Sequence, residues 1–285
     1  MTISGKSAVT AVIGGNISGS LSPVIHNIWY QDLGIDGVYV PFQSTVEAFK
    51  ENVNGLFGSG VKGLNVTVPL KEEAYKFADI LTEEAQQAEA VNCLYIGDDG
   101  KVIGHNTDGI GFIASVKALD PAFDFTNANV LVLGAGGAAS GIISGLKQLG
   151  VKKFDVLNRT FSKAESLATL FSDGHTVVKA FDSHDALKGG YDLILNTTTL
   201  KKVIPNGLNE LPLELLKNSN CVIDINYGFA PNLFLDRAKA QGCKTCDGIE
   251  MLVQQARPSF QLFNRSDLPE TTDALYQALN KAMGI

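Results

Sequence analysis

Two segments of this chain each end a strand-like apolar run in a side chain that can carry or hold a proton. Residues 62–71 read KGLNVTVPLK and end in Lys71, whereas residues 104–111 read GHNTDGIG and contain Asp108. A lysine ammonium can donate a proton to a reacting oxygen, and a neighbouring aspartate can orient it. Beside a nicotinamide, such a pair is equipped to move a proton and a hydride together. Lys71 and Asp108 are therefore the candidate catalytic residues.

A third segment, residues 130–139, reads VLVLGAGGAA and predicts a strand that runs into a tight turn. The turn fits the pattern G-x-G-x-x-G/A, in which glycines allow the turn and let the backbone approach a pyrophosphate at a helix N-terminus. The residues expected to contact a dinucleotide are Gly134, Ala135, Gly136, Gly137 and Ala138. The alternative is a glycine-rich turn that serves only the packing of a helix on a strand.

The end of the next predicted strand favours NADP over NAD. An NAD site places Asp or Glu there to hold the ribose 2′-hydroxyl. This chain instead has Asn158, Arg159 and Thr160, followed by Lys163, with no carboxylate at the strand end. Because a guanidinium and an ammonium suit phosphate oxygens, Arg159 and Lys163 are expected to bind the 2′-phosphate of NADP, with Asn158 and Thr160 beside them at the cofactor. The alternative is an exposed basic start to a helix.

The whole chain alternates strands with helices, which predicts an α/β fold with parallel sheets. Ser22 and Pro23 predict a helix start, with the serine as its N-cap. Strands are expected at residues 8–13, 38–42, 61–68, 91–96, 101–104, 130–133, 154–158, 177–180, 191–196 and 221–224. Helices are expected at residues 22–33, 45–57, 108–119, 249–263 and 271–283, with two short ones before residue 89 and further helical stretches between the later strands.

These elements predict two domains. Residues 1–107 together with 249–285 are expected to form an N-terminal α/β substrate-binding, catalytic domain, to which the C-terminal helices return. Residues 108–248 are expected to form a Rossmann-type, doubly wound NADP-binding domain. The chain has 285 residues, of which 45% are hydrophobic, so two cores can be filled.

Composition excludes several classes of function. The net charge is −7 without a basic run, which disfavours nucleic-acid and anionic-membrane binding. No signal peptide or membrane span is expected, and the four cysteines do not form a disulfide framework. A reducing cytoplasm fits this pattern. Cys243 and Cys246 lack a second ligand pair for zinc, so no metal site is expected.

In combination, the motifs resemble those of shikimate dehydrogenases over nearly the whole chain. The matching segments are residues 20–23 (SLSP) with His26 and Asn27, residues 65–71 (NVTVPLK), residues 90–92 (AVN), residues 106–111 (NTDGIG), residues 134–138, residues 158–160 (NRT), residues 224–227 and residues 251–255 (MLVQQ). The resemblance implies NADPH-dependent reduction of 3-dehydroshikimate and the reverse oxidation of shikimate.

The resemblance also implies a role for each matching residue. The hydroxyls of Ser20 and Ser22 would bind the substrate carboxylate, and Tyr227 would reach that carboxylate or line the cofactor side. Lys71 would give its proton to the reacting oxygen while Asp108 orients it. The other residues implied are Thr67, Asn92 and Gln255 at ring hydroxyls, Asn65 in support of the strand end, and Thr198 and Gly248 at the cofactor.

Three segments depart from the family pattern and leave alternatives open. Residues 15–19 lack the usual proline and histidine, residues 197–202 differ in the loop that faces the cofactor in the family, and residues 228–232 differ from the usual pattern after the tyrosine. A quinate/shikimate or aminoshikimate dehydrogenase of the same family therefore remains an alternative. So do a non-catalytic NADP-binding sensor and a pterin-linked methylene dehydrogenase. Either a monomer or a homodimer fits the sequence.

Overall fold

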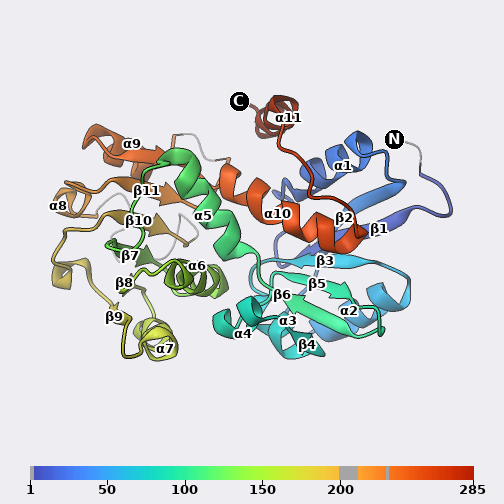
Figure 1. Cartoon of the computed structure of the whole chain (residues 1–285), viewed down its shortest axis with the longest axis horizontal. Helices are drawn as coiled ribbons and strands as arrows, with labels where there is room; N and C mark the ends of the chain where they lie inside the picture. The colour runs from blue at the N-terminus through green and yellow to red at the C-terminus, as the bar shows by residue number, and fades with distance from the viewer. Residues whose placement is uncertain (1–2, 199–210, 229–230) are drawn as a thin grey trace. The chain divides into compact units, whose positions relative to one another are not determined.

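The computed structural model describes residues 3–198, 211–228 and 231–285, which form two compact units (Figure 1). The first unit joins Met1–Thr107 to Leu252–Ile285, and the second is Asp108–Met251. Each unit contains its own six-stranded sheet with helices beside it. The predicted α/β fold and the return of the C-terminal helices to the first unit are thereby confirmed. Within the described ranges, no helix is both long and apolar enough to cross a bilayer.

The sheet of the first unit is mixed, with strand order β2-β1-β3-β5-β6-β4. β1 runs parallel to β2 and β3, whereas β5 pairs antiparallel with β3 and β6. The strands are β1 (Ala8–Gly14), β2 (Gly37–Gln43), β3 (Gly63–Val66), β4 (Ile80–Leu81), β5 (Cys93–Ile96) and β6 (Val102–His105). The helices are α1 (Ser22–Asp32), α2 (Phe49–Gly58), α3 (Lys71–Phe77), α4 (Glu83–Ala88), α11 (Asp273–Met283) and most of α10 (Ile249–Asn264).

The sheet of the second unit is parallel throughout, with strand order β12-β11-β10-β7-β8-β9. This is the doubly wound order, in which the chain direction across the sheet reverses between β7 and β10. The strands are β7 (Asn129–Leu133), β8 (Lys153–Leu157), β9 (Val177–Phe181), β10 (Leu193–Asn196), β11 (Cys221–Asp224) and β12 (Lys244–Cys246). The helices are α5 (Asp108–Leu119), α6 (Gly137–Gln148), α7 (Phe161–Phe171), α8 (Leu213–Leu216) and α9 (Leu233–Ala240). The predicted Rossmann-type sheet is confirmed.

The two faces of this parallel sheet bury different apolar clusters. On one face, Val130, Val132, Phe154 and Val156 pack with α5, α6 and α7. On the other face, Leu131, Leu133 and Leu157 pack with Tyr191, α8 and α9. The alternation along each strand separates these sets, because successive side chains point to opposite faces.

Some local predictions were wrong. The helix expected at residues 45–57 begins only at Phe49, because the Thr45 hydroxyl accepts a bond from Ala48 N and closes a turn first. The strands β4 and β12 were not expected. A helical stretch was expected between β9 and β10, but this crossover holds only the single 3₁₀ turn η1 (His184–Ala186). Ser22 was expected to cap α1, yet it is the first helical residue and Leu21 occupies the cap position.

The absence of a side chain at Gly63 allows α10 to pack closely on the sheet of the first unit. A Cβ built on Gly63 of β3 would lie 2.0 Å from Cδ1 of Phe263, so only glycine admits that ring. At the C-terminal end of the chain, Trp29 Nε1 donates to the Glu270 carbonyl at 3.0 Å. These contacts attach the C-terminal helices to the N-terminal sheet and thereby fix the position of Gln255 and Ser259 on α10.

His26 is fully buried in an aromatic cluster on α1 and β2. Its ring stacks on Tyr39 with 3.9 Å between centroids, and Trp29 and Phe260 lie around it. Neither ring nitrogen has a hydrogen-bond partner among the described residues. Because burial without a partner disfavours the charged imidazolium, the pKa of His26 is lowered to about 3.

This shift predicts a loss of stability in acid. The folded pKa lies below the unfolded one, so between about pH 6.5 and pH 3 only the unfolded chain binds the proton. As the pH is lowered through that window, the free energy of unfolding should therefore fall by about 1.4 kcal/mol for each pH unit. In denaturant titrations from pH 7 to pH 4, His26→Phe should lose this part of the slope, whereas the exposed-site control His175→Gln should keep it. An unchanged slope in His26→Phe would contradict the assignment.

Candidate active site

At the carboxyl end of β3, both the oxygen and the nitrogen of the Asn65 side-chain amide form hydrogen bonds within the protein. The Asn65 side chain accepts from the Tyr39 hydroxyl at 2.9 Å and donates to Ser259 Oγ at 2.9 Å and to the Asn92 carbonyl at 3.4 Å. Asn65 is buried, so these bonds meet no competition from water. Its geometry therefore suits the supporting role expected of it: Asn65 joins β2, β3, the start of β5 and α10.

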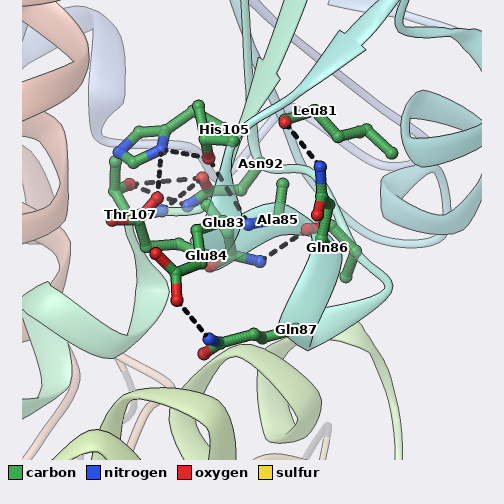
Figure 2. Close-up of polar contacts among 12 residues, drawn as sticks. Leu81, Glu83, Glu84, Ala85, Gln86, Gln87, Asn92, His105 and Thr107 are labelled. Atoms are coloured by element: carbon green, nitrogen blue, oxygen red, sulfur yellow. Dashed lines mark hydrogen bonds and ion pairs between the residues drawn. The ribbon is translucent and has the colours of Figure 1, made fainter.

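A second amide cluster lies where β5 begins and β6 ends (Figure 2). The Asn92 side chain accepts from Thr107 N at 2.9 Å and donates to Thr107 Oγ1 at 2.9 Å and to Gln255 Oε1 at 3.3 Å. Thr107 Oγ1 also lies 3.4 Å from Gln255 Oε1. The structure thus brings together Asn92 and Gln255, which the sequence places far apart. Thr107, which was not among the predicted site residues, connects them.

His105 supports this cluster from the neighbouring strand end. Its carbonyl accepts from Asn92 N at 3.1 Å, and its Nδ1 lies 2.8 Å from the Thr82 hydroxyl and 3.5 Å from Glu84 Oε2 (Figure 2). Burial lowers the pKa of His105, and the nearby Glu84 carboxylate opposes that shift. His105 therefore contributes to the position of Asn92 through its backbone.

Thr67 and Lys71 follow β3 on a turn that contains the cis peptide Val68–Pro69. A Cβ on Gly14 would lie 2.3 Å from Thr67 Cγ2, so the glycine at the end of β1 makes room for this side chain. The Thr67 hydroxyl has no partner among the described residues, which leaves it available to a ligand. Lys71 opens α3, and its carbonyl accepts from Val91 N at 3.1 Å, next to the Asn92 cluster.

Ser20 and Ser22 lie at the start of α1. Ser20 Oγ accepts from Ser22 N at 3.3 Å, so it is Ser20 that satisfies a donor in the first turn of this helix. Ser22 is buried as a residue, and its hydroxyl bonds to no described residue. The hydroxyl oxygen itself is not a buried unsatisfied atom, so it is accessible to a ligand. Two adjacent hydroxyls at a helix N-terminus suit a carboxylate.

Asp108 opens α5 and the second unit. Its position depends on α6, because the two helices cross where neither has a side chain. A Cβ on Gly109 would lie 2.8 Å from the Gly141 carbonyl oxygen, and a Cβ on Gly145 would lie 2.7 Å from Gly109 Cα. This backbone contact fixes Asp108 relative to the helix that begins at the dinucleotide turn. Lys71 belongs to the first unit, so its pairing with Asp108 remains a prediction.

The dinucleotide turn leaves β7 with the geometry an anion needs. Gly134 has φ +111°, and a Cβ there would lie 2.5 Å from Thr197 Oγ1, so the position requires glycine twice over. A Cβ on Gly136 would meet nothing within 4 Å, which leaves open space beside the start of α6. The first intrahelical donor is Ser140 N, and the first turn has no acidic residue. The backbone N–H groups that precede Ser140 at the start of α6 have no acceptor within the helix. They make the open space beside this helix start electropositive, so it fits a pyrophosphate.

The end of β8 supports the choice of NADP. Asn158 is buried and donates from Nδ2 to the Thr160 carbonyl at 2.8 Å, which shapes the turn into α7. Arg159 and Lys163 are exposed on this turn, and the first turn of α7 has no acidic residue. The residues present thus fit a 2′-phosphate and offer no carboxylate to a 2′-hydroxyl.

A buried carboxylate organises the ends of β10 and β11. Asp224 accepts from Asn196 Nδ2, Asn226 N, Asn226 Nδ2 and Asn232 Nδ2 at 2.7–3.0 Å. The Thr198 carbonyl in turn accepts from Asn226 Nδ2 at 2.6 Å. Asp224 was predicted only as part of a motif, and this network was not predicted. The sequence feature that could have predicted this network is the presence of asparagines at and after the ends of β10 and β11: Asn196, Asn226 and Asn232.

The remaining predicted cofactor-side residues lie on this network. Thr198 is buried beside Gly134, and Tyr227 follows β11 as a half-buried residue. A Cβ on Gly248 would lie 1.9 Å from the Ile225 carbonyl oxygen, and Gly248 N donates to the Asn226 carbonyl at 3.0 Å. Residues 199–202 and 229–230, parts of the departing segments, lie outside the described residues.

A parallel sheet with an anion cradle at its switch point, joined to a unit that gathers amides, hydroxyls and a lysine, defines a dinucleotide-dependent oxidoreductase. Residues 12–94 match the family described as shikimate dehydrogenase substrate binding domain, and residues 117–227 match shikimate / quinate 5-dehydrogenase. The chain belongs to the shikimate dehydrogenase family.

Curated relatives agree with this assignment. The chain is 41% identical to the shikimate dehydrogenase (NADP(+)) of Caulobacter vibrioides, over 91% of this chain and 90% of that protein. It is 37% identical to the shikimate dehydrogenase (NADP(+)) of Rhodospirillum rubrum, over 97% of this chain and 98% of that protein.

Solved structures of the family are similar over almost the whole chain. Shikimate dehydrogenase from Aquifex aeolicus has a TM-score of 0.83 and 33% identity, covering 99% of both chains. The Thermus thermophilus enzyme in complex with NADP(H) and shikimate has a TM-score of 0.81 and 31% identity, covering 96% of this chain and 99% of that one. A 5-ketofructose reductase of Gluconobacter is also similar, with a TM-score of 0.79 and 28% identity over 98% of this chain and 99% of that one.

The glycine crossing of α5 and α6 gives a testable prediction. Gly145→Ala places a Cβ against the Gly109 backbone, which cannot move as a flexible side chain would. The free energy of unfolding should fall by about 1–3 kcal/mol. The matched control is Gly55→Ala in α2, where a Cβ meets nothing within 4 Å, and it should raise stability slightly. Equal effects of both variants in denaturant titrations would contradict the crossing.

Proposed function

We propose that this chain is an NADP-dependent shikimate dehydrogenase that interconverts 3-dehydroshikimate and shikimate. The observation that carries the proposal is the set of polar groups in the first unit, because it suits a small polyol carboxylate. Ser20 and Ser22 offer hydroxyls to a carboxylate, while Thr67, Asn92 and Gln255 offer groups for ring hydroxyls. Relatives named shikimate dehydrogenase (NADP(+)), and the Thermus thermophilus complex with NADP(H) and shikimate, support the same substrate and cofactor.

The reaction reduces a ring ketone to a hydroxyl. NADPH, when bound at the α6 cradle, supplies the hydride that adds to the carbonyl carbon. The Lys71 ammonium donates a hydrogen bond to the carbonyl oxygen and gives that oxygen its proton as negative charge develops there. Asp108 accepts a hydrogen bond from Lys71 and from a neighbouring substrate hydroxyl, which orients both. Lys71 recovers its proton from solvent, and the oxidation of shikimate runs through the same steps in reverse.

The state of the thiols supports a proposal for the cellular setting. All four cysteines are free, and burial raises the pKa of Cys93 and Cys246 to about 12, so neither is a reactive thiol. Cys243 donates its thiol hydrogen to the Leu216 carbonyl. These are structural thiols, and they fit a reducing cytoplasm. We propose a cytoplasmic enzyme that acts as a monomer or a homodimer within aromatic amino acid biosynthesis.

The proposed function is tested by following NADPH absorbance at 340 nm with purified protein. Shikimate and quinate are offered separately, each with NADP+ and with NAD+. The expected result is turnover of shikimate with NADP+ and at least about tenfold lower kcat/KM with NAD+, because Arg159 and Lys163 would lose their phosphate partner. Preference for quinate would move the protein to the quinate branch of its family. NADPH binding without turnover of either substrate would favour the sensor alternative.

The role of Lys71 predicts a large effect on turnover. Lys71→Ala should lower kcat at least about a hundredfold, with a smaller effect on KM, because the general acid acts mainly in the transition state. Lys76→Ala is a matched control on the same helix, since Lys76 is exposed and pairs with Glu73 at 2.7 Å. Unchanged turnover in folded Lys71→Ala protein would rule out this role.

A further inference from the structure

The missing helix between β9 and β10 leaves part of the second unit's sheet uncovered. α7 covers β8 and β9 on one face, through Ala164, Leu167 and Phe171. On the opposite face, α8 and α9 reach the β10 and β11 side of the sheet, as the buried cluster shows. Among the described residues, that face of β8 and β9 meets only the short crossover with η1, from which Leu187 and Tyr191 pack inward.

A cavity of about 350 Å³ lies on this uncovered face. Its lining includes Lys153 and Asp155 of β8, Lys179 of β9, and the crossover residues Gly189, Gly190 and Tyr191. Lys179 pairs in register with Asp155, so the two lysines stand on neighbouring strands and on the same face. The volume is at the small end of the range for sites that take small molecules.

The cavity carries excess positive charge. Neither the Lys153 nor the Lys179 side chain forms an ion pair or a hydrogen bond with any described residue. Asp155 is the one carboxylate in the lining, and it already accepts from the Tyr191 hydroxyl at 2.6 Å. Burial and the Asp155 carboxylate raise the pKa of Tyr191, so this hydroxyl keeps its proton. Two unpaired ammonium groups thus face a cavity in a chain whose net charge is −7.

Backbone donors add to this charge. Gly189 and Gly190 have φ +74° and +78°, a conformation that suits two consecutive glycines. The backbone N–H groups of Gly189, Gly190 and Tyr191 donate to no described residue, although all three residues line the cavity. Unpaired N–H groups beside lysines form a concave surface suited to oxyanions.

This cavity is separate from the dinucleotide cradle. It lies at the amino ends of β7 and β8, whereas the cradle follows Leu133 at the carboxyl end of β7. The five residues of β7 span roughly 15 Å at the rise of an extended strand. A ligand in the cavity would therefore leave the pyrophosphate position clear.

We propose that this cavity is a second binding site in the Rossmann unit, which takes a small oxyanion ligand, a carboxylate or a phosphate, held by Lys153, Lys179 and the amides of residues 189–191. The inference does not rest on the proposed function, because none of these residues belongs to the candidate active site.

The test is calorimetric titration of the full chain with two probes, benzoate for carboxylates and inorganic phosphate for phosphates, at low ionic strength. Each titration is run without NADP+ and with saturating NADP+, which keeps the cradle filled. The expected result is saturable binding of at least one probe, one per chain, that persists with NADP+. Lys153→Ala/Lys179→Ala should weaken it at least about tenfold, because two charged donors are lost.

Lys152→Ala is the matched control, since Lys152 is exposed, adjacent in sequence and outside the lining. It should bind the probe as the unmodified chain does. A preference for benzoate or for phosphate assigns the ligand class. Absence of saturable binding of both probes, binding that disappears with NADP+, or equal weakening in Lys152→Ala would each overturn the proposal. Because the lysines are exposed, thermal melting of all variants should be unchanged, which separates lost binding from lost folding.

Discussion

The peptide bond between Thr107 and Asp108 is the point on which the arrangement of the site depends. On its amino side, Thr107 is buried and held to Asn92 through both its backbone N–H and its hydroxyl. On its carboxyl side, Asp108 begins α5, and the next residue, Gly109, lies against the backbone of α6. One bond therefore joins the residues proposed to hold the substrate to α5, which packs against the helix that begins at the dinucleotide turn.

Glycine also occurs at other positions where the backbone lies close to a side chain or to another backbone segment. Gly14 makes room for Thr67, Gly63 for Phe263, and Gly248 for the turn after β11. In each case the glycine lies at or near a strand end. Buried amides then complete the arrangement, because an amide can both donate and accept within a small space. Asn65, Asn92 and Asp224 with its amide partners are held by bonds that water cannot replace.

Much of this could be predicted from the sequence. Apolar runs predicted all strands of the two sheets except the short β4 and β12, and the glycine pattern at residues 134–138 predicted the turn between β7 and α6, because both signals are local. The unusual features were not local. The Gly109 and Gly145 contact requires knowing which helices cross, and the Thr107 bridge joins segments far apart in sequence. The crossover at residues 182–191 was expected to hold a helix, yet its glycines and short apolar content allow only one 3₁₀ turn. Ser22 was misread as a cap because Ser20, two residues earlier, supplies that bond.

We propose that Lys71 and Asp108 handle the proton together, although they belong to different units of the fold. A double-mutant cycle tests it most directly: kcat for shikimate oxidation is measured for Lys71→Ala, Asp108→Asn and the double variant, with folding checked for each. Residues that act together are non-additive, so the double variant should lose little more than the worse single variant. If the two losses multiply, Lys71 and Asp108 act independently and the account is contradicted.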